Sequence, residues 1–265
     1  MTVALIAGEG SLPEIIASRL AQSGDKPLVY AFREDIEALA ANAGAVVPLD
    51  GARLALALGD MVSRGVRQVM LAGLIPKKLM YRPEMMDEMA ASLLGGLSER
   101  DDHSLLGAIV ALFENSGMEV LGYRNLLKDL LAGKGRIAGR APSEAEVTDA
   151  AYGAKIAREV LPLSFGQSLV ISGRAVVAVE AMEGTDEAIS RAGTLCREGV
   201  LVKMIKPGQD ERYDLPVVGS RTLRSMAAAK LTCLAIHAGW TLVLDPDKFG
   251  RTAMEAGISV IGIDY

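Results

Sequence analysis

Short apolar runs alternate with stretches of helical spacing along the first half of the chain. The runs cover residues 3–7, 28–32, 69–72 and 118–121. This alternation is typical of a parallel sheet flanked by helices. After the first run, apolar residues recur at helical intervals, and Ser11 with Glu14 predicts a capping box at the start of that helix. We therefore predict an N-terminal Rossmann-like α/β domain.

Glycine and arginine concentrate at residues 133–142, where we place the boundary between two domains. A new helix is predicted after them, with Ser143 as N-cap and Glu146 completing a capping box. The predicted domains are residues 1–136 and residues 137–265, the second being α/β (α+β). Its strands are predicted at 168–171, 175–181, 200–204, 232–236, 242–244 and 260–263, and its helices after Thr185, Arg221 and Pro246.

The composition is that of an ordinary globular protein of 265 residues, with 50% hydrophobic and 23% charged residues. Cys196 and Cys233 lie among apolar neighbours, so we expect core thiols rather than a disulfide framework or a zinc ribbon. The start shows no signal-peptide pattern and no apolar run has the length of a membrane span, which predicts a cytoplasmic protein. The net charge of -5 gives no broad attraction to nucleic acid, so no such partner is expected.

One connection carries far more charge than a turn needs. The run KPGQDERYDLPVVG, residues 206–219, holds two cations, three carboxylates and an amide between apolar segments. Such a set offers metal ligation, phosphate pairing and proton transfer together. A solvated surface loop is the alternative interpretation, and both stay open on this segment alone.

A second acidic cluster follows a predicted strand at Glu180, Glu183 and Asp186. Thr185 is predicted as the N-cap of the next helix, where Asp186 complements the helix dipole, and these two residues need no further function. Glu180 and Glu183 have no such structural role. Magnesium prefers one or two carboxylates with substrate phosphate oxygens, which these acids would supply if they faced the carboxylates of residues 206–219.

Gly8, Glu9 and Gly10 follow the first strand and open a helix, so their N–H groups are candidates for a phosphate cradle. Pro13 stands where a dinucleotide fingerprint needs its third glycine, which weakens a nicotinamide interpretation. Glu34, after the second strand, could still serve as the acid that binds a ribose. A tight turn without any ligand is the alternative.

The two histidines give no metal-ligand spacing. Asp101 or Asp102 is expected to cap the helix that runs through Leu105, with His103 solvated beside it. His237 follows an apolar strand, and we expect it to be packed or hydrogen-bonded rather than to act as a general base.

Taken together, five segments resemble the LpxI family of UDP-2,3-diacylglucosamine pyrophosphatases, in order along almost the whole chain. They are LIAGEGSLP, DDHSLL, RAPSEAEVTDAAYG, GQSLVISGRAVVAVEAMEGTDEAISRAG and KPGQDERYDLPVVGSRT. The resemblance implies a two-domain cytoplasmic hydrolase of lipid A biosynthesis that depends on Mg²⁺ and produces UMP and 2,3-diacylglucosamine 1-phosphate. Tyr213 stands where phenylalanine is common in the family, and no charged candidate is missing.

The resemblance, read with the charged clusters, gives the expected site residues. Asp210, Asp214 and Glu183 are the expected catalytic residues, and Asp210, Asp214 and Asp186 the expected metal ligands. The residues expected to bind substrate are Gly8, Gly10, Ser11, Gln167, Gly184, Thr185, Lys203, Lys206, Gln209 and Arg212.

The substrate of that family carries two acyl chains, which must be sheltered by the protein or by a membrane surface. One candidate shelter is an apolar patch of Leu79, Met80, Tyr81, Met85, Met86 and Met89, with core or dimer packing as its alternative. Peripheral contact with the inner face of the inner membrane and a homodimer are therefore open expectations. Two rival functions also stay open: a non-catalytic protein that binds nucleotide sugar or lipid, and a nucleotide-dependent oxidoreductase.

Overall fold

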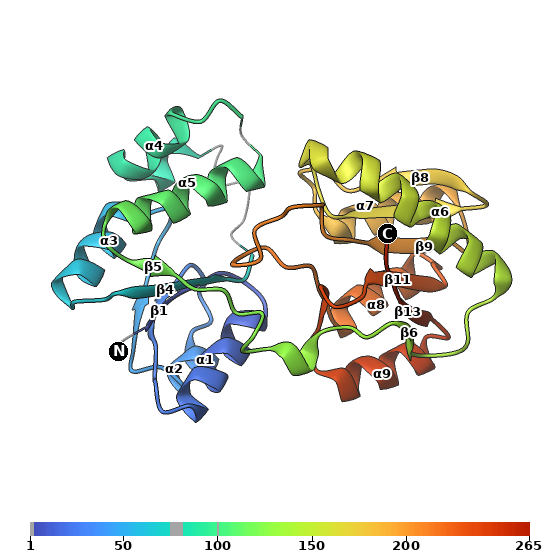
Figure 1. Cartoon of the computed structure of the whole chain (residues 1–265), viewed down its shortest axis with the longest axis horizontal. Coiled ribbons are helices and arrows are strands. Elements are labelled where there is room, and N and C mark those ends of the chain that lie inside the picture. The colour runs from blue at the N-terminus through green and yellow to red at the C-terminus, as the bar shows by residue number, and fades with distance from the viewer. Residues whose placement is uncertain (1–2, 75–81, 100) are drawn as a thin grey trace. The chain divides into compact units, whose positions relative to one another are not determined.

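The computed structural model describes residues 3–74, 82–99 and 101–265, and the chain divides into two compact units (Figure 1). The first unit comprises Met1–Leu126 and Asp210–Asp214, and the second comprises Leu127–Gln209 and Leu215–Tyr265. The division falls ten residues before the boundary predicted at 136, because Leu131 bridges to Leu242 and the Ala132 N–H donates to the Thr241 carbonyl at 2.8 Å. Strand β6 (Gly135–Ala138), which was not predicted, also pairs with the sheet of the second unit. Residues 210–214 return to the first unit, which the predicted boundary did not anticipate.

The first unit contains a five-stranded parallel sheet in the order β3-β2-β1-β4-β5 (Figure 1). This confirms the predicted Rossmann-like fold class. Strand β3 was not predicted, because its four residues are exposed or half-buried and end in proline. The strands are β1 (Val3–Ala7), β2 (Leu28–Ala31), β3 (Ala45–Pro48), β4 (Gln68–Ala72) and β5 (Glu119–Val120).

Helices cover both faces of the first sheet, with α1 and α2 on one face and α3, α4 and α5 on the other (Figure 1). Tyr30, Met61 and Phe113 lie in the core under the second face. The capping box predicted at Ser11 is wrong: Ser11 is the N-cap of α1, but its side chain makes no capping hydrogen bond. The helices are α1 (Leu12–Gln22), α2 (Glu37–Ala40), α3 (Leu54–Ser63), α4 (Glu88–Gly95) and α5 (Asp102–Asn115).

The second unit contains a six-stranded mixed sheet in the order β6-β13-β11-β9-β7-β8. Strands β9, β11 and β13 are parallel, and β7 runs antiparallel to β9 and to β8. Strands β8, β9, β11 and β13 therefore all end at one edge, where β7 begins. The strands are β6, β7 (Ser168–Ser172), β8 (Ala175–Val179), β9 (Val200–Lys203), β11 (Cys233–His237) and β13 (Ser259–Ile263), while β10 (Val217–Val218) and β12 (Leu242–Val243) form a separate ribbon.

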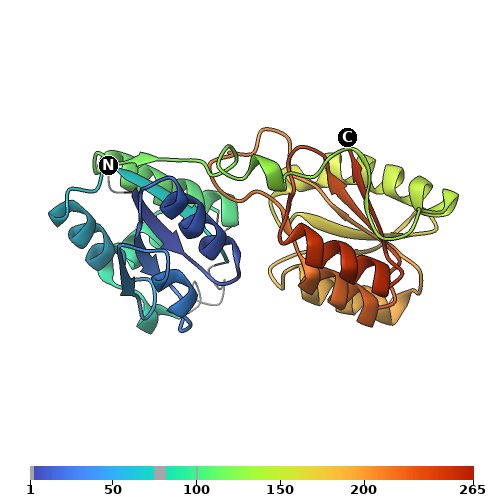
Figure 2. The ribbon, with the colours of Figure 1, turned by 90° about the horizontal axis from the view of Figure 1, so that it is seen from below.

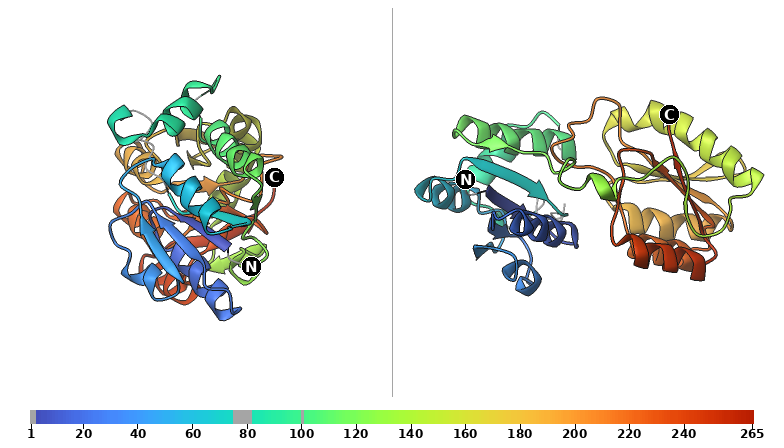
Figure 3. Two further views of the ribbon diagram at one scale, coloured as in Figure 1. Left: turned by 90° about the vertical axis from the view of Figure 1, so that its left-hand side faces the viewer. Right: turned by 60° about the horizontal axis from the view of Figure 1, so that its bottom comes forward.

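Helix α6 lies on one face of the second sheet, and α7, α8 and α9 lie on the other (Figures 2 and 3). The capping box predicted at Ser143 is confirmed, because its hydroxyl accepts from the Glu146 N–H and the Glu146 side chain accepts from the Ser143 N–H. No helix of the described residues is long and apolar enough to cross a membrane. The helices are α6 (Glu144–Val160), α7 (Thr185–Leu195), α8 (Ser220–Ala228) and α9 (Pro246–Glu255).

Candidate active site

The segment Asp210–Asp214, here called the crossing segment, leaves the second unit and attaches to the first. Tyr213 is only 4% exposed and lies in the same core cluster as Phe113. A side chain at Gly122, just after β5, would approach the Arg212 Cα to 3.2 Å. The crossing segment thus lies beside the carboxyl end of β5, and the carboxyl ends of the strands are where open α/β sheets bind ligands.

Both sides of the Arg212 guanidinium form ion pairs with carboxylates of the first unit. Its Nε lies 3.0 Å from each Asp210 oxygen and its Nη2 2.7 Å from Asp210 Oδ2, while Nη1 lies 2.6 Å from Glu114 Oε1. The hydrogen bonds to Asp210 and then to Glu114 raise the pKa of Arg212 well above its ordinary value. Arg212 is expected to bind substrate, and that stays a prediction; in this structure its guanidinium pairs with Asp210 and Glu114.

Asp214 ends the crossing segment in a left-handed backbone conformation, with φ of 59°. Few non-glycine residues adopt this region, and aspartate is among those enriched in it. At the other end, Asp210 Oδ1 accepts from the Arg212 backbone N–H at 3.0 Å, which closes a local turn. Two of the three expected catalytic carboxylates, Asp210 and Asp214, are thus carried by one short segment with a defined backbone conformation at each end.

The glycines after β1 meet a neighbouring loop instead of forming a cradle. The Gly8 and Glu9 N–H groups donate to the carbonyls of Ala72 and Leu74 at 2.8 Å each, so those two donors are not open to a phosphate. A Cβ on Gly8 would lie 2.6 Å from the Leu74 oxygen, which explains why glycine is required there. Gly10, from the predicted cradle, and Ser11, which is expected to bind substrate, remain as candidates at this sheet edge.

A buried amine stands at the carboxyl end of β9 in the second unit. Lys203 is 7% exposed, and its Nζ donates to Thr185 Oγ1 at 2.9 Å and to Ser168 Oγ at 3.4 Å. Thr185 was predicted as an N-cap, but Gly184 occupies that position and Thr185 is the first residue of α7. The Thr185 hydroxyl is therefore directed to Lys203, which fits its second predicted role at a binding site.

Two buried polar side chains at the same edge have unpartnered atoms. Glu180 follows β8, is 8% exposed, and its Oε2 makes no hydrogen bond among the described residues. His237 ends β11, is 8% exposed, and its Nδ1 is also unpartnered there, with the ring edge-on to Tyr265 at 4.9 Å. Burial lowers the pKa of His237, against the opposing charge of Asp264. The sequence flagged Glu180 as acidic without a structural role, but neither residue was among the expected site residues.

Glu183 and Asp186, the other two members of the acidic cluster that begins at Glu180, make contacts within the second unit. Glu183 pairs with Arg191 of α7. Burial would raise the pKa of Glu183, but hydrogen bonds from its own backbone N–H and from Arg191 together lower it. Asp186 accepts from Ser225 Oγ at 2.8 Å and pairs with Arg221 at 2.7 Å, which ties α7 to α8. Their predicted roles in catalysis and metal binding would therefore have to compete with these partners.

The chain between Lys203 and the crossing segment is held by short polar contacts. Lys206 Nζ donates to Ser164 Oγ at 3.0 Å, and its N–H lies 3.3 Å from Gln209 Oε1. Gln167, another expected binding residue, accepts the Met204 N–H through its backbone carbonyl at 3.0 Å. Lys206 and Gln167 therefore belong to the surroundings of the β9 end.

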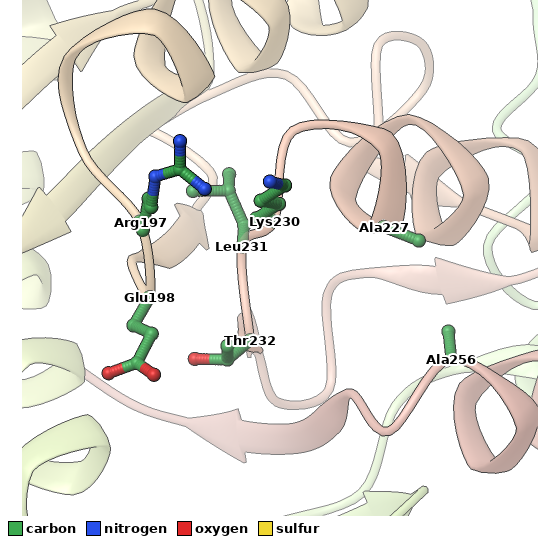
Figure 4. Close-up of a pocket in the computed structure, with 7 residues that line it drawn as sticks. All are labelled: Arg197, Glu198, Ala227, Lys230, Leu231, Thr232 and Ala256. Atoms are coloured by element: carbon green, nitrogen blue, oxygen red, sulfur yellow. The ribbon is translucent and has the colours of Figure 1, made fainter.

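No group of three or more His, Cys, Asp or Glu side chains that could hold a metal ion occurs in the part of the chain that the structure describes. A hollow of about 320 Å³ is lined by Arg197, Glu198, Lys230 and Thr232 (Figure 4). These residues precede β9 and β11, so the hollow lies at the amino ends of the strands. It is on the sheet edge opposite to Lys203 and carries none of the expected site residues.

Two further predicted features lie partly within the described residues. Asp101 caps α5 as predicted, since its Oδ1 accepts from the Ser104 N–H at 2.9 Å. In the predicted apolar patch, Met85, Met86 and Met89 are half-buried. Its remaining members, Leu79, Met80 and Tyr81, lie outside the described residues, as does the side chain of His103.

Comparison with known proteins assigns both halves of the chain. The LpxI N-terminal domain matches residues 2–130, and the LpxI C-terminal domain matches residues 133–261. A relative from Caulobacter vibrioides, named UDP-2,3-diacylglucosamine pyrophosphatase LpxI, is 30% identical over 273 aligned positions that cover 98% of this chain and 96% of the relative. The chain belongs to the LpxI family.

Proposed function

We propose that this protein hydrolyses the pyrophosphate bond of UDP-2,3-diacylglucosamine to UMP and 2,3-diacylglucosamine 1-phosphate in lipid A biosynthesis. The observation that carries the proposal is the match along 98% of the chain to a relative named for this activity, with both domains in the family order. Polar side chains at the carboxyl edge of each sheet support it, because open α/β sheets place their ligands at that edge.

The reaction breaks a phosphorus–oxygen bond with water, which needs a positioned nucleophile and compensation of phosphate charge. Asp210 and Asp214 are the proposed carboxylates for orienting the water, because the crossing segment fixes their backbone. Asp210 is moreover held by Arg212 through both of its oxygens. Gly10 and Ser11, at the carboxyl end of β1, are proposed to bind the nucleotide end of the substrate.

Lys203 is the proposed phosphate-binding cation. Its amine is buried, and its described partners are the neutral hydroxyls of Thr185 and Ser168. A buried charge normally requires a counterion or strong hydrogen bonds, so an anionic substrate would complete this environment. Lys206, three residues later in sequence, is proposed to assist it.

The side chains present fit Mg²⁺ as a cofactor that is bound together with the substrate. Mg²⁺ prefers oxygen ligands and is usually held by one or two carboxylates with substrate phosphate oxygens, keeping several waters. Asp214 would supply one of those carboxylates, and Asp210 would supply the other in competition with Arg212, which is bonded to both of its oxygens. The described residues contain no ready cluster of three ligands. When bound, the ion would neutralise charge on the pyrophosphate oxygens.

The test is to incubate purified protein with UDP-2,3-diacylglucosamine, with Mg²⁺ and then with a chelator, and to follow products by mass spectrometry. We expect UMP and 2,3-diacylglucosamine 1-phosphate in the presence of Mg²⁺ and little product after chelation. Absence of both products from folded protein with Mg²⁺ would overturn the proposed function. Product formation unaffected by chelation would remove Mg²⁺ from it.

A further inference from the structure

We infer that Glu114, at the end of α5, is a positioning residue for the reaction that acts on Asp210 through Arg212. The inference rests on the proposed function of Asp210. Glu114 belongs to the first unit, and its Oε1 lies 2.6 Å from Arg212 Nη1. Glu114 accepts from Nη1, the one guanidinium nitrogen that does not bond to Asp210.

The guanidinium is planar and rigid, so fixing one side of it fixes the other. With Nη1 held by Glu114, Nε and Nη2 are presented to the carboxylate of Asp210 as a two-pronged donor. Without Glu114, the long Arg212 side chain regains freedom, and the orientation of Asp210 is lost with it.

The residues next to Glu114 and Arg212 are buried in the same hydrophobic core. Phe113 precedes Glu114 and is 2% exposed, while Tyr213 follows Arg212 and is 4% exposed, and the two belong to one hydrophobic cluster. Each partner of the ion pair therefore has a buried neighbour that fixes its backbone.

The exposure of the pair argues against a purely stabilising role. The side chains of Arg212 and Glu114 are 36% and 47% exposed, and ion pairs in such positions contribute little to stability. If the pair only stabilised the fold, loss of Glu114 would have a small effect on both stability and turnover. A role in positioning predicts an effect on turnover that exceeds the effect on stability, because small misplacements of catalytic groups are costly.

The experiment compares Glu114→Gln, Asp210→Asn and the double variant, with Glu119→Gln as control. Glu119 is a carboxylate of the same unit that accepts from Gln68 at 3.0 Å. We expect Glu114→Gln to lower kcat about 10-fold with little change in KM or Tm. We expect no further loss when Glu114→Gln is added to Asp210→Asn, and no effect from Glu119→Gln.

Two outcomes separate this inference from the proposed function. If Asp210→Asn abolishes most turnover while Glu114→Gln leaves kcat unchanged, or if the two losses multiply, the positioning role is overturned and the proposed function stands. Hydrogen exchange gives a readout that needs no turnover: the Arg212 amide, bonded to Asp210, should exchange faster in Glu114→Gln than in Glu119→Gln. Equal exchange in the two variants would overturn the inference, whatever the substrate.

Discussion

Lys203 Nζ lies 2.9 Å from the hydroxyl of Thr185, which joins the end of β9 to the first turn of α7. The buried amine is thereby held at the helix start, where partial positive charge also favours an anion. The two residues are 18 positions apart in sequence, yet they define one candidate phosphate site.

Replacing Lys203 with methionine keeps most of the side-chain volume and removes the charge. We expect kcat/KM to fall about 30-fold, since hydrogen bonds to charged groups contribute about 1.5–3 kcal/mol. Steady-state kinetics with UDP-2,3-diacylglucosamine provides the measurement. Lys155→Met, on the exposed side of α6, is the control. Equal kinetics in the two variants would exclude Lys203 from phosphate binding.

Glu180→Gln separates function from stability at the same sheet edge. Because Glu180 Oε2 is buried without a described partner, removing the charge should leave the free energy of unfolding unchanged or raise it by about 1 kcal/mol. We expect turnover to fall in the same variant, because Glu180 is buried at the sheet edge that carries Lys203. Urea unfolding and a product assay on one preparation measure both properties. A loss of stability with unchanged turnover would assign Glu180 to the fold.

Gly166 offers a second way to disturb that carboxylate. A Cβ at Gly166 would lie 2.6 Å from the Glu180 carbonyl and 2.8 Å from its Cγ. We expect Gly166→Ala to displace Glu180 and to lower turnover at least as much as Glu180→Gln. Gly250→Ala, where a Cβ meets nothing within 4 Å, is the matched control for the assay. Full activity in Gly166→Ala would show that the position of Glu180 is unimportant.

The ion pair between Arg140 and Glu146 should make the free energy of unfolding fall in acid. Burial alone would raise the pKa of Glu146, but hydrogen bonds from Arg140 and from the Ser143 N–H lower it to about 2. Because the folded pKa is depressed, the stabilisation is present above the ordinary value of 4.5 and is lost as pH falls toward 2.

We expect Glu146→Gln to lower the free energy of unfolding at pH 7 by about 2 kcal/mol and to flatten its dependence on pH between 4.5 and 2. Urea unfolding at a series of pH values measures both effects. An unchanged slope in the variant would show that the stabilisation does not come from this carboxylate.

The fold was largely predictable because its central strands are apolar and fully buried, as in Val3–Ala7. Strand Gly135–Ala138 escaped prediction because its four residues are exposed or half-buried and include Gly and Arg. This strand is stabilised by pairing with Ser259–Ile263, far along the chain. The local pattern of apolar residues cannot reveal such a distant partner.

The candidate site was predictable in its composition but not in its contacts. The charge of residues 206–219 was plain from sequence, whereas the burial of Tyr213 in the first unit depends on tertiary packing. Spacing also could not show that Arg212 would hold Asp210, or that Asp186 would bind Arg221 of α8. Residue type identifies the chemistry available, and only the fold decides which groups meet.

The most direct measurement is the turnover of UDP-2,3-diacylglucosamine by Asp210→Asn and Asp214→Asn beside the wild type, with circular dichroism to verify folding. The proposed mechanism predicts that wild-type protein forms UMP and 2,3-diacylglucosamine 1-phosphate. It also predicts that at least one variant, although folded, loses about 100-fold or more in kcat. Full turnover in both folded variants would contradict the claim that the crossing segment carries the catalytic carboxylates.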